Sequence, residues 1–159
     1  MKGKIRHSAT GKRNSGFTLI EMMIVVAIMA ILFAIAIPFW TAYRQNAELK
    51  SAAGNIVADI ADLKARASTE RLTYTMTFTN ATGSPTTDGY RITRQVGGAT
   101  ENVSSKSVKP IEMTGADEIR FDARGTTSEG EIKLKNSNGR TATINVNITG
   151  RTNVQYSNS

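Results

Sequence analysis

The feature that constrains this chain most is an apolar run near its N-terminus. Residues Phe17 to Trp40 number 24 and include a single charged side chain, Glu21. As a helix rising 1.5 Å per residue, this run would extend about 36 Å, which is enough to cross a hydrocarbon core about 30 Å thick. The run therefore predicts a transmembrane helix.

The segment before this run is strongly basic. It holds five cations and no acid: Lys2, Lys4, Arg6, Lys12 and Arg13. A cationic leader favours a cytoplasmic N-terminus, with the rest of the chain on the far side of the membrane. Loss of residues 1–16 would leave 15 cations against 13 acids, so the formal charge of +7 belongs mostly to the leader. The remaining chain is then nearly neutral.

The chain has few of the residue types that commonly carry catalysis or bind metal ions. The chain has no cysteine, and its one histidine, His7, lies in the basic leader. The commonest nucleophiles, bases and transition-metal ligands are therefore missing from residues 17–159. We expect no enzyme, no cofactor and no metal. Asp59 and Asp62 lie three residues apart, but Lys64 and Arg66 beside them favour surface ion pairs over a metal pair.

Three interpretations of the N-terminal segment compete. A secretory signal cut after Ala36 would use the Ala34-Ile35-Ala36 pattern, but the uncharged run continues to Trp40, beyond the usual length of such a signal. A plain membrane anchor explains the apolar residues but leaves Glu21 without a role, although an acid is costly inside a membrane. A prepilin signal is the third interpretation.

The run Gly16-Phe17-Thr18-Leu19-Ile20-Glu21, placed between a basic leader and an apolar helix, resembles the type IV pilins and the pseudopilins of type II secretion. The resemblance implies that a prepilin peptidase of the inner membrane cuts between Gly16 and Phe17 and methylates the new amine of Phe17. It also implies that Glu21 attracts the N-terminal amine of a neighbouring subunit during assembly. A buried carboxylate and ammonium are each costly alone and much less so together.

Residues 41–71 are predicted to form an amphipathic helix that continues the apolar one. Its apolar positions step by three or four residues: Leu49, Ala53, Ile56, Ile60, Leu63 and Ala67. Pro38 interrupts the combined helix and predicts a kink or a locally melted stretch, because an interior proline removes a backbone hydrogen bond.

Residues 72–159 are predicted to form a β domain. Apolar side chains alternate with polar ones from Leu72 to Phe78, which is the pattern of a half-buried strand. Further strands are expected around Tyr90–Val96, within Val103–Met113 and at Ile119–Phe121. The last unit of the domain is predicted to be a hairpin that turns at Asn138-Gly139. The predicted fold is α+β, with a long N-terminal helix packed on a C-terminal antiparallel sheet.

Three shorter runs, at residues 63–70, 119–125 and 148–151, look like the minor pilins and minor pseudopilins of the group of the type II secretion H-protein and FimT/FimU. Some members of that group bind DNA through a Gly-Arg-x-Arg motif. This chain has Gly150-Arg151-Thr152-Asn153, which lacks the second arginine. DNA binding through Arg151, with Lys133, Lys135 and Arg140 as a basic edge, is therefore one alternative. Charges that keep a sheet edge soluble are the other.

The resulting expectation is a structural subunit of a type IV pilus or a type II secretion pseudopilus. Its partners would be other pilin or pseudopilin subunits, the prepilin peptidase and the inner membrane, with DNA as the alternative. The chain would cross the inner membrane once, with its N-terminus in the cytoplasm and its C-terminal domain in the periplasm or on the filament.

Overall fold

The computed structural model describes residues 16–78 and 89–158. Of the expected leader, only Gly16 falls within the described residues. The chain divides into two compact units, residues 1–39 and residues 40–159. Each unit is described by itself below.

One long helix, α1 (Leu19–Glu70), contributes to both units. Its first turn is capped by Thr18, whose Oγ1 accepts a hydrogen bond from the backbone N–H of Glu21 at 3.2 Å. Such a cap satisfies one of the backbone donors that a helix start leaves unpaired. The helix ends where Arg71 takes a left-handed φ of 56°, a conformation that stops α-helices. The helix continues across Pro38, and the kink stays a prediction.

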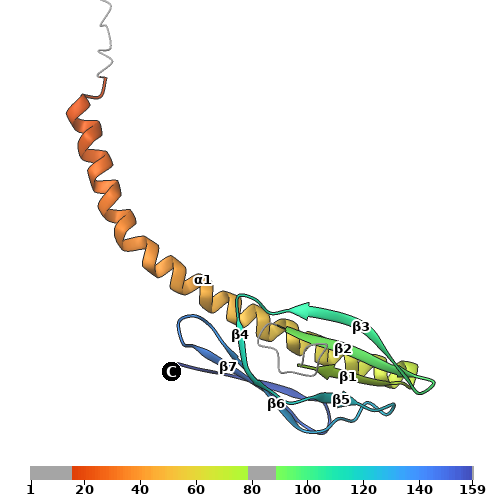
Figure 1. The fold of residues 1–159 in the computed structure, drawn as a ribbon. Coiled ribbons are helices and arrows are strands. Elements are labelled where there is room, and N and C mark those ends of the chain that lie inside the picture. The colour runs from red at the N-terminus through yellow and green to blue at the C-terminus, as the bar shows by residue number, and fades with distance from the viewer. Residues whose placement is uncertain (1–15, 79–88, 159) are drawn as a thin grey trace, which may run out of the picture. The chain divides into compact units, whose positions relative to one another are not determined.

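The second unit holds eight described strands in two antiparallel sheets (Figure 1). The first sheet has the order β3-β2-β1-β5, built from β1 (Thr73–Thr77), β2 (Gly89–Val96), β3 (Ala99–Ser107) and β5 (Ile119–Phe121). The second has the order β4-β6-β7-β8, built from β4 (Glu112–Ala116), β6 (Gly130–Lys135), β7 (Thr141–Val146) and β8 (Thr152–Ser157). The α+β prediction is confirmed, with two sheets in place of one.

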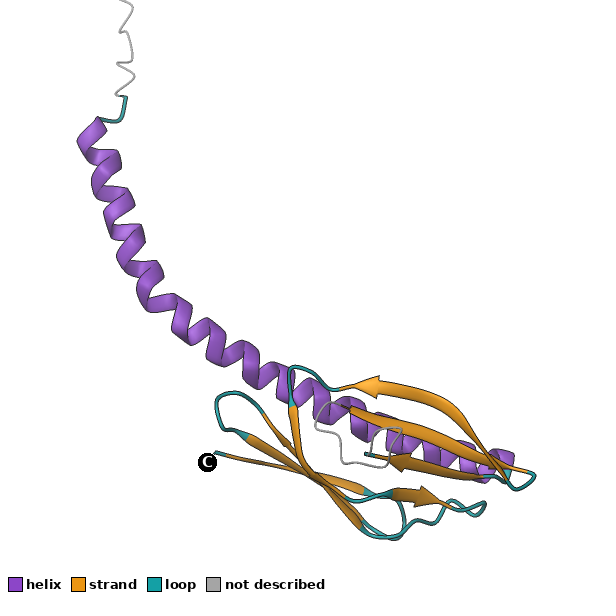
Figure 2. Cartoon of the chain, viewed as in Figure 1, coloured by secondary structure: helices purple, strands orange, loops and turns teal. Residues whose placement is uncertain are grey.

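Within this unit, the second half of α1 lies along the strands (Figure 2). All six apolar positions of the predicted stripe are buried, from Leu49 to Ala67. They share one core with side chains from six of the strands and the β3–β4 connection: Tyr74, Met76, Tyr90, Ile92, Val108, Ile111, Met113, Ile119, Phe121, Ile132, Leu134, Ala142, Ile144 and Val146. Val154 of β8 packs against this core. Burial of this apolar surface is the main contribution that holds the helix on the sheets.

Register follows from the alternation of buried and exposed side chains. In β6, Ile132 and Leu134 face the core and pair with Ile144 and Ala142 of β7. A slip of one residue would turn all of these side chains to the solvent. The predicted hairpin is therefore present, and β8 extends it by pairing with β7.

Three loops of the β domain share one construction. Each begins with Asp or Asn, namely Asp122, Asn136 and Asn147, and has glycine three residues later. The first residue's side-chain oxygen accepts the backbone N–H of the fifth residue at 2.8–3.0 Å. The glycines have φ values of 77°, 83° and 70°, which side-chain-bearing residues adopt at a cost. The pattern Asx-x-x-Gly thus specifies three tight turns.

The buried stripe of α1 yields a first prediction. Ile60→Ala removes a fully buried side chain and should lower the free energy of unfolding by about 2–5 kcal/mol, because it leaves a cavity in the core. Urea unfolding of the detergent-solubilised chain, followed by circular dichroism, measures this loss. The matched control is Lys50→Ala on the exposed side of the same helix, which should change stability by less than about 0.5 kcal/mol. Equal losses for both variants would contradict the packing described.

The first of the three turns predicts a dependence on pH. Hydrogen bonds from Thr126 and Arg124 hold the pKa of Asp122 below its ordinary value. Because this pKa is lower in the folded chain, the stabilisation is complete above the unfolded-state value of about 3.9 and is lost as the pH falls through the folded-state value. Asp122→Asn should keep the turn, since Asn occupies the same place in the other two, but should lose this acid dependence.

The comparison is made by urea unfolding of both proteins from about pH 6 down to about pH 3. The stability difference between the unsubstituted chain and Asp122→Asn should shrink as the pH falls. Glu118→Gln, which changes an exposed carboxylate outside the turn, serves as the control and should leave the pH profile unchanged. A difference that stays constant over this range would show that the charge on Asp122 does not stabilise the turn.

Candidate functional site

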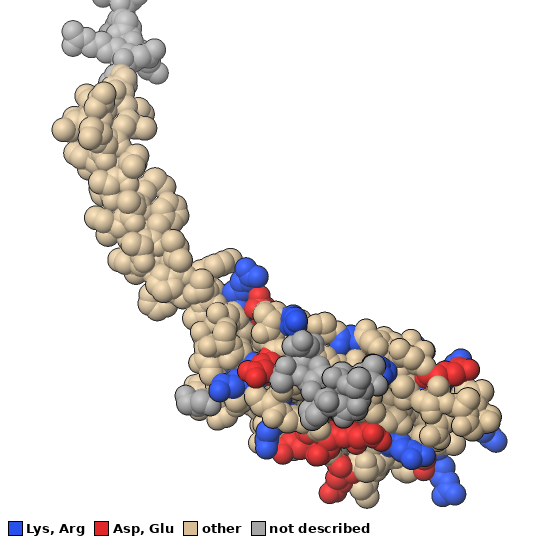
Figure 3. All heavy atoms as spheres, viewed as in Figure 1, with Lys and Arg blue, Asp and Glu red and all other residues tan. Residues whose placement is uncertain are grey.

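The apolar segment is exposed along its whole length in the single chain. Every residue from Phe17 to Thr41 has an exposed side chain, and Phe17 is 79% exposed. On the visible face of this segment no charged side chain appears, whereas red and blue side chains gather on the β domain (Figure 3). Among the described helices α1 is long and apolar enough to cross a membrane. A surface of this kind marks a site for lipid or for other proteins.

The predicted cleavage site lies just before this helix. Gly16 and Phe17 are exposed and precede the first residue of α1, Leu19. Among the described residues, chain neighbours aside, no atom lies within 4 Å of the position that a Cβ on Gly16 would take. An exposed segment outside a helix is the kind of site at which chains are usually cut by proteases. Cleavage between Gly16 and Phe17 and methylation of Phe17 stay predictions.

Glu21 lies in the first turn of α1 and has an exposed side chain. The bond from its backbone N–H to Thr18 is one of the two bonds of a Thr-x-x-Glu capping box, a pattern that is readable in the sequence. An acid in a first turn also interacts favourably with the helix dipole. Glu21 therefore has a local structural role in the chain alone. Its role in assembly stays a prediction.

Of the four cations of the predicted DNA-binding edge, Lys133 and Lys135 share the exposed face of β6, whereas Arg151 lies apart from Arg140. Lys133 lies on β6 inside its sheet and forms an ion pair with Glu131 at 2.9 Å. Arg140 precedes β7 and Arg151 follows it, so the six residues of that strand, about 20 Å, separate them. Lys135 lies on the exposed face of β6, at the end nearer Arg140.

The surroundings of Arg151 are acidic. It lines an open groove of about 750 Å³ together with Asp117, Glu129 and Glu131. Carboxylates that share a groove with one guanidinium weaken its attraction for phosphate. Gly150 belongs to the third tight turn, where its φ of 70° is required. DNA binding through Arg151 stays a prediction that this groove disfavours.

The three short runs that suggested the minor pilin group meet at the C-terminal end of α1. The Nζ of Lys64 donates to the carbonyl of Thr149 at 2.8 Å. A Cβ on Gly150 would lie 2.8 Å from the ring of Phe121, and one on Gly125 would lie 3.5 Å from the Cβ of Ser68. These residues therefore form a packing junction that pins two loops of the β domain against the helix.

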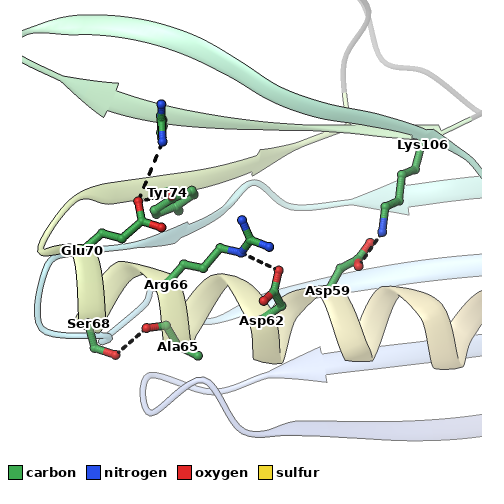
Figure 4. A network of polar contacts seen from close by, with 9 residues as sticks. Asp59, Asp62, Ala65, Arg66, Ser68, Glu70, Tyr74 and Lys106 are labelled. Carbon is green, nitrogen blue, oxygen red and sulfur yellow. Dashed lines mark hydrogen bonds and ion pairs between the residues drawn. The ribbon is translucent and has the colours of Figure 1, made fainter.

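A second set of polar contacts joins the same helix to the first sheet (Figure 4). Asp59, which is only 14% exposed, pairs with Lys106 of β3 at 2.6 Å and accepts a hydrogen bond from the hydroxyl of Tyr90. Burial, followed by the nearby carboxylate, raises the pKa of Tyr90, so its hydroxyl remains a donor. The sequence predicts a surface ion pair for Asp59, whereas its carboxylate is largely buried. Its helical position alone gave no sign of the strands that pack beside it.

The remaining contacts of this set lie at the helix end. Asp62 pairs with Arg66 one turn later at 2.8 Å. Glu70 accepts a hydrogen bond from Tyr74 at 2.6 Å and lies 3.8 Å from Arg94. Among the described residues, no group of three or more acids or histidines is placed to hold a metal ion. Tyr74 and Arg94 thus connect the end of α1 to β1 and β2.

Comparisons with known proteins agree with this geometry. A family described as the prokaryotic N-terminal methylation motif matches residues 11–37. The type IV major pilin protein PilA of Myxococcus xanthus (strain DK1622) is 48% identical over 54 residues, which are 34% of this chain and 24% of that protein. A fimbrial protein of Pseudomonas aeruginosa is 37% identical over 81 residues, 45% of this chain and 53% of that protein. The chain thus spans from a quarter to about half of these relatives.

Solved structures extend the similarity to the β domain. A crystal structure of the type IV minor pilin FimU of Pseudomonas aeruginosa (strain PAO1) matches with a TM-score of 0.55 at 15% identity, over 71% of this chain and 92% of that one. A second crystal form of the same protein matches with a TM-score of 0.52. At this identity the match concerns the fold. The N-terminal segment thus matches the prokaryotic N-terminal methylation motif, and the chain is similar in fold to a solved type IV minor pilin.

Proposed function

We propose that this chain is a minor subunit of a type IV filament, made as a prepilin, cut after Gly16, methylated on Phe17 and inserted through its apolar helix. The coarser role, that of a type IV pilin subunit, is structural and not enzymatic. The observation that carries the proposal is the contrast within α1. Residues 17–41 expose their apolar side chains, whereas the stripe from Leu49 onward is buried in a complete core.

The exposed half of the helix needs a cover. Contiguous apolar surface of this extent is unfavourable in water, at roughly 25 cal/mol per Å². Before assembly the inner membrane would provide the cover, with the N-terminus in the cytoplasm and the β domain in the periplasm. After assembly the helices of neighbouring subunits would provide it. The folded domain, which needs no such cover, would then form the outer part of the filament.

A minor role is supported by the fold similarity, which extends over most of a protein titled a minor pilin. The curated relatives are named as a major pilin and as fimbrial proteins, but they match at most 45% of this chain. The structural match covers 71% of this chain and extends into the β domain, so we give it more weight than the shorter sequence matches in choosing between a minor and a major subunit. The same reasoning applies whether the filament is a pilus or a secretion pseudopilus.

Glu21 is proposed to pair with the methylated amine of Phe17 of an adjacent subunit. A charged amine buried among apolar helices is costly unless a carboxylate lies beside it. Glu21 is the only charged residue between Gly16 and Arg44, so no other side chain of this segment can serve. The pair would set the axial position of the incoming subunit.

This role gives a direct test. Glu21→Gln keeps the size of the side chain but leaves the amine without a counterion, a loss of about 3 kcal/mol for a broken buried pair. Incorporation into sheared filaments of the producing cell, measured by immunoblot, should fall roughly a hundredfold. The membrane fraction should still contain the variant. The matched control is Glu48→Gln, the same change on the same helix, where Glu48 faces Arg44. Normal incorporation of Glu21→Gln would contradict the proposed role.

A further inference from the structure

The end of the apolar segment carries two aromatic side chains with polar tips. Trp40 and Tyr43 lie three residues apart on α1, with ring centroids 6.3 Å apart and ring planes inclined by 37°. Trp40 is 70% exposed and Tyr43 is 69% exposed. Residues three apart lie on the same side of a helix, so the two rings form a single exposed patch that the core of the domain does not use.

The position of this patch matches a membrane boundary. The uncharged run from Met22 to Phe39 rises about 27 Å as a helix, close to the hydrocarbon thickness of about 30 Å. Trp40 follows immediately. The next charged residue is Arg44, which pairs with Glu48 at 2.8 Å and is well exposed. The buried core of the domain begins at Leu49. The patch thus separates the apolar run from the first charges.

The chemistry of the two rings suits the same place. Tryptophan and tyrosine combine an apolar ring with a hydrogen-bond donor, and both are enriched where the hydrocarbon of a bilayer meets its headgroups. Between Glu21 and Trp40 no side chain carries a hydrogen-bond donor. Only the end of the run that leads into the β domain carries this pair.

We propose that Trp40 and Tyr43 form an interfacial anchor, which binds the glycerol and headgroup layer of the phospholipid bilayer and sets the depth of the unassembled subunit. This inference rests on the proposed function, because it requires that residues 17–39 cross the membrane. It adds a specific lipid-binding element, which neither the methylation motif nor the fold assigns.

The anchor has a consequence for Glu21. Trp40 lies nineteen positions after Glu21, a rise of about 28 Å. When Trp40 lies at one boundary of the hydrocarbon, Glu21 lies near the other. An acid there costs less than at the centre of the bilayer. The anchor therefore holds both Glu21 and the Gly16–Phe17 bond at the cytoplasmic face, where processing would occur.

The test uses the fact that Trp40 is the only tryptophan of the chain. The full-length chain is reconstituted in vesicles of phosphatidylethanolamine and phosphatidylglycerol. Its fluorescence is quenched with lipids that carry bromine either near the headgroup or near the end of the acyl chain. The anchor predicts stronger quenching by the shallow label. The double variant Trp40→Phe/Tyr43→Trp moves the reporter about 4.5 Å toward water and should favour the shallow label further.

The matched reference is Trp40→Phe/Phe33→Trp, which places the only tryptophan about 10 Å deeper along the helix. It should be quenched best by the deep label. If it is, and Trp40 is also quenched best by the deep label or only by a water-soluble quencher, the anchor is wrong while the membrane span stands. Quenching of neither position by lipid would overturn both the anchor and the proposed function. Trp40 emission that is shifted to the blue but insensitive to lipid labels would show another copy of the chain covering the patch, which also contradicts the anchor.

Discussion

Burial of one side of a single helix is the interaction on which the rest of the structure depends. From Leu49 to Ala67 the apolar side chains of α1 lie in a core to which both sheets contribute. N-terminal to that stretch, the same helix carries apolar side chains on all sides, and these remain exposed from Phe17 to Thr41. One continuous element therefore serves two environments. The apolar side chains from Leu49 to Ala67 are buried within the chain. Those from Phe17 to Thr41 can be buried only by a membrane or by other proteins.

Polar contacts reinforce the attachment of the helix at several levels. Asp59 joins α1 to β2 and β3 through Tyr90 and Lys106. Further along, Lys64 reaches the loop at Thr149, and Glu70 binds Tyr74 at the helix end. Together these contacts join α1 to both sheets. Such an attachment suits a subunit whose domain must stay on its stem within a filament.

The periodicity of apolar residues predicted those helices and strands that bury one face and expose the other. The stripe of α1 and the alternation in β1, β6 and β7 were read directly from the spacing of apolar residues, because burial on one face imposes that spacing. The division into two sheets was not predictable in this way. It depends on which distant strands pair, as when β5 returns to β1. The edge strand β8 was missed because only Val154 packs against the core, so the strand has little apolar alternation.

For the candidate site, the run from Gly16 to Glu21 indicated a prepilin signal from residue identity alone, since this chemistry lies in a short contiguous segment. The Gly150-Arg151 pair illustrates what a sequence motif leaves out, namely its neighbours in space. In the structure it is part of a tight turn, and Arg151 lines a groove to which three carboxylates also contribute.

The most direct test of the account is the intact mass of the protein extracted from the membrane of its producing cell. The account predicts a product that begins at Phe17 and carries one additional methyl group. An uncut chain that begins at Met1, or a product that begins at Ile37, would contradict it.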